Sequence, residues 1–142
     1  MINKTKYVTI LIIFILAIIA SGVLTFVSVE QACGDIQTTC YAVQTSQYET
    51  TFGIKNAHIG LFAFSIMAIL TFIHLKKPSK YKKTLLTLGI IGGTIFALYF
   101  LYIQFFILDA MCRYCMVIDI GMLINLGIII LWKEKEKIPT FN

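Results

Sequence analysis

Four long apolar blocks constrain the fold of this chain more than any other feature. Each can cross a hydrocarbon core of about 30 Å at a rise of about 1.5 Å per helical residue. Backbone amides cannot stay unpaired in lipid, so each block is predicted to be an α-helix. The blocks are residues 7–29, 54–75, 84–108 and 112–132. The sequence therefore predicts an all-α integral membrane protein, a four-transmembrane-helix bundle in a single domain over residues 1–142.

Composition agrees with a membrane protein. Hydrophobic residues make up 58% of the 142 residues, and the mean hydropathy is +0.86. Soluble domains are typically about half apolar. The first block follows Lys4 and Lys6, as a signal peptide would, but it is long for one and lacks a small-x-small cleavage site. Glu30 and Gln31 also disfavour a lipoprotein signal at Cys33, so we expect a retained helix.

The positive charge is concentrated in three places. Lys4 and Lys6 precede the first block, five lysines lie in the loop 76–83, and three follow the fourth block: Lys76, Lys77, Lys80, Lys82 and Lys83, then Lys133, Lys135 and Lys137. These are ten of the twelve basic residues. The other side holds Lys55 and Arg113 with four acidic residues: Glu30, Asp35, Glu49 and Asp109. The positive-inside rule then predicts cytoplasmic termini, a cytoplasmic loop 76–83 and an extracytoplasmic segment 30–53.

The net charge of +5 is explained by this topology, because the basic clusters set the orientation and contact anionic membrane lipid. No nucleic-acid partner is expected.

All four cysteines fall on the predicted extracytoplasmic side, where disulfides persist. Cys33 and Cys40 lie in segment 30–53, and Cys112 and Cys115 open the fourth block. Four cysteines allow three connectivities, and the sequence does not choose among them.

The motif CRYC places Cys112 and Cys115 on one face of a helix start. The helix N-terminus and Arg113 both favour a thiolate, so we expect a lowered thiol pKa and a reactive pair. Cys33 and Cys40, in CGDIQTTC, span a loop that suits a second pair moving between partners. Two structural disulfides remain an alternative, as does a four-cysteine zinc site, although metal sites usually show two closely spaced pairs.

A thiol pair at the mouth of a membrane helix needs an electron acceptor that lives in the membrane. A soluble oxidant does not require four membrane helices, whereas a lipid-dissolved quinone meets a thiol only at the edge of the hydrocarbon layer. We therefore expect thiol–disulfide exchange followed by two-electron transfer to a quinone. The redox-active pair Cys112 and Cys115 would lie where aqueous disulfide exchange meets the lipid-dissolved quinone.

The order of these features resembles the vitamin K epoxide reductase family, in its compact prokaryotic form without a fused thioredoxin-like domain. That order is a first helix, a widely spaced cysteine pair, a short amphipathic stretch with a serine, two further helices, and C-x-x-C opening the fourth. The stretch CYAVQTSQYETTFGIKNAHIG carries the local match, with family-like residues at these positions: Cys40, Ser46, Phe52, Gly53, Asn56 and Gly60. In the bacterial membrane oxidases of the DsbB type, C-x-x-C comes in the first outer loop instead.

The resemblance implies catalytic roles for the four cysteines. Cys112 and Cys115 resemble the active-site pair, with Cys115 facing the quinone. Cys112 would exchange with Cys40, and Cys33 and Cys40 would form the shuttle disulfide that accepts electrons from an extracytoplasmic thioredoxin-fold (DsbA-like) partner. The quinone, of menaquinone or ubiquinone type, would serve as electron acceptor, and no metal, flavin or nicotinamide is expected.

Three further residues are candidate quinone contacts. Ser46 fits both a substrate contact and a backbone cap, within a short amphipathic helix predicted over 41–52 that would cover the quinone pocket. The resemblance suggests that Asn56 bonds a quinone carbonyl, while an N-cap role is equally compatible. Asp119 stands where the animal enzymes carry a tyrosine; it is a candidate for proton delivery, or else pairs with His58 or a backbone amide.

The sequence thus predicts a quinone-dependent thiol–disulfide oxidoreductase. One alternative is a quinone-epoxide reductase running the other way. Another is a small four-helix exporter with structural disulfides, which would need a deep acidic residue. Asp119 is the one candidate for that role, and it lies near the outer surface.

Overall fold

The computed structural model describes residues 4–34 and 37–132. The predictions for both chain ends, for Asp35 and for the basic cluster at Lys133, Lys135 and Lys137 lie outside these residues. Four helices are long and apolar enough to cross a membrane: α1 (Lys4–Phe26), α4 (Asn56–Lys76), α5 (Lys80–Tyr102), continued by the π-helical turn η1 (Ile103–Ile107), and α6 (Arg113–Leu131). The prediction of a mostly helical protein with four such helices is confirmed.

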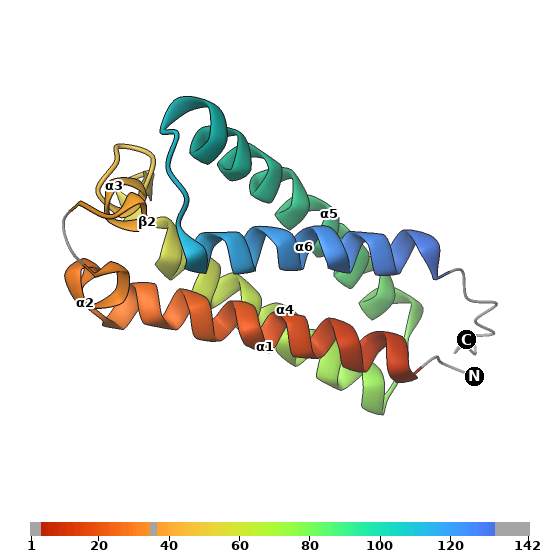
Figure 1. Ribbon diagram of the computed structural model, residues 1–142. Coiled ribbons are helices and arrows are strands. Elements are labelled where there is room, and N and C mark those ends of the chain that lie inside the picture. The colour runs from red at the N-terminus through yellow and green to blue at the C-terminus, as the bar shows by residue number, and fades with distance from the viewer. Residues whose placement is uncertain (1–3, 35–36, 133–142) are drawn as a thin grey trace.

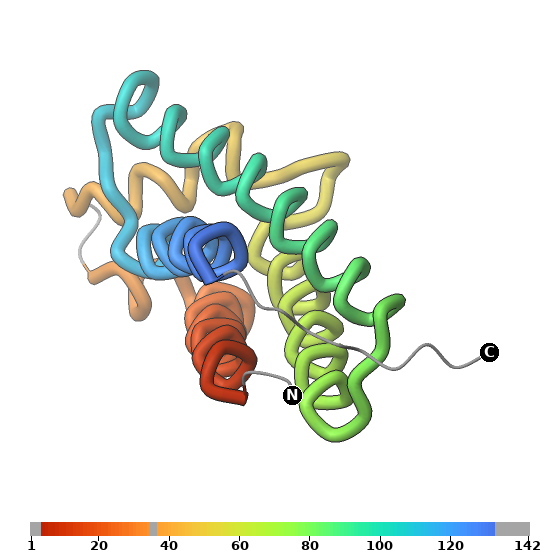
Figure 2. Tube along the Cα trace, turned by 90° about the vertical axis from the view of Figure 1, so that its right-hand side faces the viewer, coloured from red at the N-terminus to blue at the C-terminus, as the bar shows by residue number. Residues whose placement is uncertain are grey.

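The four long helices lie alongside one another, and α1 packs against both α4 and α6. Helix α5 packs against α6 and reaches α4 less extensively (Figures 1 and 2). Two short helices, α2 (Val29–Cys33) and α3 (Thr39–Gln44), gather at one end with the hairpin of β1 (Thr50–Thr51) and β2 (Ile54–Lys55). We call this the cysteine end. The lysine end holds the start of α1, the α4–α5 turn and the end of α6.

A small apolar core fills the space between the helices. It is built from side chains of α1, α4, α5 and α6: Tyr7, Ile10, Phe14, Ala68, Leu86, Ile90, Ala97 and Met122. Much of the remaining helix surface is apolar but uncovered, with large exposed side chains on every span, such as Ile12, Phe62, Ile95 and Ile124. Because each span leaves so much apolar surface open, lipid is the solvent that suits it. The chain is a multi-pass membrane protein.

Glycines of α5 allow close helix contacts. A Cβ atom added at Gly89 would collide with Met67 of α4, and one added at Gly93 would collide with Met122 of α6. The small-xxx-small spacing of these glycines in the sequence is typical of such packing. Thr94 adds a polar link, because its hydroxyl donates to the Ile90 carbonyl at 2.7 Å and lies 3.3 Å from the Met122 carbonyl of α6.

The helix predicted over 41–52 is confirmed only for residues 41–44 and is wrong for residues 45–52. The helix ends at Gln44, and residues 50–55 form the β1–β2 hairpin with Thr51 paired to Ile54. Phe52 and Gly53 turn the chain with φ of 55° and 79°. Positive φ at both central positions is the requirement of a type I′ turn, which the amphipathic spacing of aromatic residues did not reveal.

Candidate redox site

One threonine fixes the two helices that carry the first cysteine pair. Thr38 is the N-cap of α3, where its hydroxyl accepts from the Tyr41 amide at 3.3 Å. The same hydroxyl lies 3.3 Å from the carbonyl oxygen of Cys33 in α2 and donates to it. Cys33 and Cys40 are joined by a disulfide, and both side chains are buried. Of the pairings open to the sequence, the structure shows the Cys33–Cys40 disulfide, which removes two sulfurs from any four-cysteine zinc site.

The second pair opens α6. Cys112 is the N-cap residue and is fully buried, while Cys115 lies in the first turn and is partly exposed. Both are free thiols. The chain leading into α6 is held at Met111, whose carbonyl accepts from the Thr39 hydroxyl of α3 at 3.0 Å. This bond ties the start of α6 directly to the helix that carries Cys40.

The two cysteine pairs meet at a single sulfur contact. The Sγ atom of Cys40 lies 3.6 Å from the Sγ atom of Cys112, although the residues are 72 positions apart in the chain. Exchange begins when a thiolate attacks one sulfur of a disulfide. A free Cys112 sulfur beside the Cys33–Cys40 disulfide is therefore placed for exchange without any large movement of the backbone.

The thiol of Cys112 is activated by its surroundings. The hydrogen bond with the Cys115 thiol has the largest effect and helps lower the pKa of Cys112 from 9.0 to about 6, against the opposing effect of burial. The backbone amides of Cys115 and Tyr114 and the side chain of Gln44 lower the pKa further. The sequence predicted this direction from the helix N-terminus. It also credited Arg113, which is exposed and is not among the groups that shift this pKa.

A buried glutamine faces both free thiols. The Nε2 atom of Gln44 lies 3.2 Å from the sulfur of Cys115 and 3.5 Å from the sulfur of Cys112. Gln44 belongs to α3 and follows Cys40 by four residues, so the two side chains share a helix face. Gln44 was not among the candidate residues predicted from the sequence. Its spacing from Cys40 was the available signal.

A second glutamine connects α6 to the π-helical turn of α5. The Oε1 atom of Gln104 accepts from the Cys112 amide at 3.1 Å, and its Nε2 atom donates to Oδ2 of Asp119 at 3.1 Å. Its own carbonyl accepts from Ala110 at 3.0 Å. A π turn is frequent at functional sites. Gln104 was also missed, although a polar residue inside an apolar span is itself a signal.

Asp119 is brought into the site, one turn beyond Cys115 on the same face of α6. Its carboxylate is buried and accepts from Gln104. The sequence had left open a pairing with His58 or with a backbone amide. His58 instead lines a groove of about 440 Å³ between α1 and α4, together with Thr25 and Phe62.

Ser46 lies in the loop that joins α3 to α4, and Asn56 is the first residue of α4, whose N-cap is Lys55 and not Asn56. The Ser46 hydroxyl donates to the Val43 carbonyl at 2.8 Å. The Asn56 amide group donates to the Tyr48 carbonyl at 2.7 Å, and its side-chain oxygen accepts from Thr51 at 2.6 Å. Both residues therefore brace the loop, and each keeps spare hydrogen-bonding capacity that a substrate contact would use.

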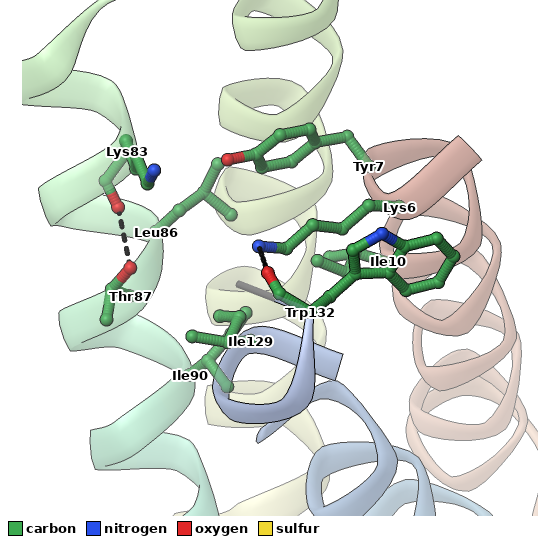
Figure 3. A pocket seen from close by; sticks show the side chains of 9 residues that line it. All are labelled: Lys6, Tyr7, Ile10, Lys83, Leu86, Thr87, Ile90, Ile129 and Trp132. Atoms are coloured by element: carbon green, nitrogen blue, oxygen red, sulfur yellow. Dashed lines mark hydrogen bonds between the residues drawn. The ribbon is translucent and has the colours of Figure 1, made fainter. Parts of the chain in front are cut away.

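A cavity of about 190 Å³ lies at the other end of the bundle (Figure 3). Lys6 and Trp132 help to line it, and the Lys6 ammonium group donates to the Trp132 carbonyl at 3.2 Å. The cavity belongs to the lysine end, whereas all four sulfurs belong to the cysteine end. It is therefore separate from the redox site.

The fold and site define a class: a four-helix membrane protein that carries two interacting cysteine pairs at one end of its bundle. The chain belongs to the vitamin K epoxide reductase family, whose sequence model matches residues 8–130. This is a family of quinone-linked thiol oxidoreductases. No curated protein and no solved structure matches the chain.

Proposed function

We propose that this protein is a quinone-dependent thiol–disulfide oxidoreductase that oxidises an extracytoplasmic thioredoxin-fold partner. The observation that carries the proposal is the 3.6 Å contact between the Cys40 and Cys112 sulfurs, with Cys33 already bonded to Cys40. This contact joins a pair carried by α2 and α3, outside the four spans, to a pair that opens a membrane helix. Electrons pass from partner thiols to Cys33–Cys40, then to Cys112–Cys115, and then to the quinone.

The proposed chemistry is balanced at each exchange. A reduced partner gives two electrons to the Cys33–Cys40 disulfide and leaves oxidised. The resulting thiols reduce the Cys112–Cys115 disulfide, and the Cys33–Cys40 disulfide forms again. The Cys112–Cys115 dithiol then gives two electrons and two protons to the quinone, which becomes the quinol while the pair returns to a disulfide.

The acceptor is proposed to approach Cys115, the partly exposed member of the pair. Asp119 lies one turn deeper on the same helix face and is the proposed proton donor to the reduced ring. Ser46, in the loop after α3, and Asn56, at the start of α4, are the proposed polar contacts. The quinone is of the menaquinone or ubiquinone type, because its long tail partitions into the lipid that surrounds the apolar helix faces.

Orientation follows from charge. The lysine end carries the turn of the 76–83 loop, so the positive-inside rule favours a cytoplasmic lysine end and an extracytoplasmic cysteine end. Disulfide chemistry suits the latter compartment. The position of Asp119 also favours redox chemistry over proton-coupled export, because its carboxylate is linked through Gln104 to the backbone of Cys112.

A direct assay tests the proposal. The full chain in lipid nanodiscs is mixed with a reduced thioredoxin-fold donor and a short-chain quinone, and quinone absorbance is followed. Cys112→Ala and Cys115→Ala are each expected to abolish quinone reduction. The control Thr45→Ala changes an exposed residue at the end of α3 and should leave quinone reduction unchanged. Undiminished turnover in both cysteine variants would remove the proposal. Turnover with a quinone epoxide in place of the quinone, with one donor dithiol oxidised for each epoxide reduced, would favour the quinone-epoxide reductase alternative.

A further inference from the structure

Gln44 has no part in the proposed electron path, yet its side-chain amide contacts both free thiols. It is buried, and its Nε2 atom lies within hydrogen-bonding distance of both free thiols, 3.2 Å from Cys115 and 3.5 Å from Cys112. Helix α3 holds Gln44 on the same face as Cys40, four residues away. The helix thus presents a reacting sulfur and a hydrogen-bond donor to the same pair.

We infer that the Gln44 carboxamide stabilises the thiolates of the second pair, donating hydrogen bonds to the sulfurs of Cys115 and Cys112 in turn, as each leaves as a thiolate during exchange with Cys33 and Cys40. The inference rests on the proposed function for the direction of electron flow. The contacts themselves do not depend on that direction.

The two leaving groups follow from the order of bonds. The Cys40 thiolate attacks Cys112 of the Cys112–Cys115 disulfide; a Cys40–Cys112 bond forms, and Cys115 leaves as a thiolate. The Cys33 thiolate then attacks Cys40; the Cys33–Cys40 bond forms, and Cys112 leaves as a thiolate. Two electrons have moved from the first pair to the second, and the two protons released by Cys33 and Cys40 equal those that the second pair takes up. The structure shows the end state of this sequence.

A neutral amide suits this task. The NH₂ group of glutamine has two hydrogens, one for each sulfur, and it carries no charge that would need a partner when both cysteines are bonded to each other. Hydrogen bonds to a charged acceptor are roughly twice as strong as those between neutral groups. The contribution of Gln44 should therefore be large when a thiolate is present and small when the thiols are protonated.

The test measures how one disulfide distributes between the two pairs. The full chain in nanodiscs is equilibrated in a glutathione buffer that leaves one disulfide per molecule. It is then acid-quenched, alkylated, digested and analysed by mass spectrometry for the ratio of Cys33–Cys40 to Cys112–Cys115 disulfide. In Gln44→Met, which keeps the shape but removes the donor, we expect this ratio at pH 8 to fall about tenfold, because the reduced second pair loses its thiolate stabilisation.

The pH profile separates this role from simple packing. The difference between wild type and Gln44→Met should shrink as the pH falls and the thiolate is protonated. Gln44→Glu should lower the ratio further at pH 8, because a carboxylate repels the thiolate, and should recover toward wild type at low pH, where the carboxyl group can donate. Gln47→Met, an equivalent change at an exposed glutamine, should match wild type throughout.

A ratio in Gln44→Met within twofold of wild type overturns the inference, and so does a shift of the same size at every pH. If Gln44→Met does not fold, Gln44→Glu alone decides. Its disulfide ratio must return toward the wild-type ratio at low pH, and a ratio that stays low there overturns the inference. No quinone or partner protein enters this measurement. A chain that fails to reduce quinone but shows the Gln44 effect therefore contradicts the proposed function and leaves this inference standing.

Discussion

The sulfur of Cys40 lies 3.6 Å from the sulfur of Cys112 while it is bonded to Cys33. Three cysteines are thus arranged so that the central one can change partners between a loop cysteine and a helix cysteine. Cys115 stands beside Cys112 but is not the residue that Cys40 contacts. This order of contacts makes the intermediate of the exchange predictable.

The double variant Cys33→Ala/Cys115→Ala should accumulate a Cys40–Cys112 disulfide under mild oxidation, because both resolving thiols are gone and the two remaining sulfurs are already adjacent. Peptide mapping by mass spectrometry identifies the bond. Cys33→Ala/Cys112→Ala is the matched control and should form a Cys40–Cys115 bond much more slowly. Equal yields in the two variants would contradict the assigned order.

Cys112 should titrate as a thiolate with a low pKa. With Cys33–Cys40 oxidised, the ultraviolet absorbance of the thiolate should be nearly constant above pH 7 and should be lost below pH 6, because the pKa of Cys112 is lowered to about 6. The difference spectrum against Cys112→Ala gives the titration, and no reagent has to reach the buried sulfur. A midpoint near the ordinary thiol value of 9.0 would contradict the described surroundings.

The bond between Gln104 and Asp119 should stabilise the cysteine end. Asp119→Leu leaves the buried Gln104 amide without its acceptor, and we expect the free energy of unfolding to fall by about 1 kcal/mol, in line with hydrogen bonds between membrane helices. Asp119→Asn keeps an acceptor oxygen and should lose less. Thermal unfolding in detergent measures both. When Gln104→Leu is combined with Asp119→Leu, the double variant should lose less than the sum of the single losses, since both changes remove the same Gln104–Asp119 bond. Gln104→Leu alone should lose more than Asp119→Leu, because it also removes the acceptor of the Cys112 amide.

The glycines of α5 offer a matched pair for helix packing. Gly92→Ala should stabilise the helix by up to about 1 kcal/mol, because alanine is the better helix former and the new methyl group meets open space. Gly93→Ala should gain less, because its methyl group must displace the end of Met122. Melting temperatures report the difference. In a Met122→Ala background the two variants should behave alike, and a persistent difference would contradict this contact.

Orientation can be measured by labelling intact cells. In a cysteine-free chain, a single cysteine at Thr50 should react with a membrane-impermeant maleimide added outside. A single cysteine at Lys80 should react only after the membrane is opened. Both positions are exposed, so access depends on the side of the membrane. The reverse pattern would place the cysteine pairs in the cytoplasm and exclude the proposed partner.

Local patterns in the chain were enough to predict a four-helix membrane protein and thiol redox chemistry. Hydropathy over twenty residues predicts a membrane helix because the bilayer imposes it on each segment separately. The same is true of Cys112 and Cys115, which lie three residues apart at the N-cap and in the first turn of one helix. The prediction of a helix over 41–52 was wrong because aromatic spacing is also compatible with a hairpin, and the turn at Phe52 and Gly53 decided between them.

Only the tertiary structure decided which groups meet. Cys40 and Gln44 contact residues about seventy positions away, and those contacts depend on how α3 folds over the start of α6. Gln104 reaches the Cys112 amide and Asp119 because a π-helical turn ends α5 beside α6. No periodicity within one segment encodes such meetings, since they are set by the packing of several segments at once. The sequence by itself determined four spans and two cysteine pairs, and the packing of the cysteine end determined which sulfurs and which amides act on one another.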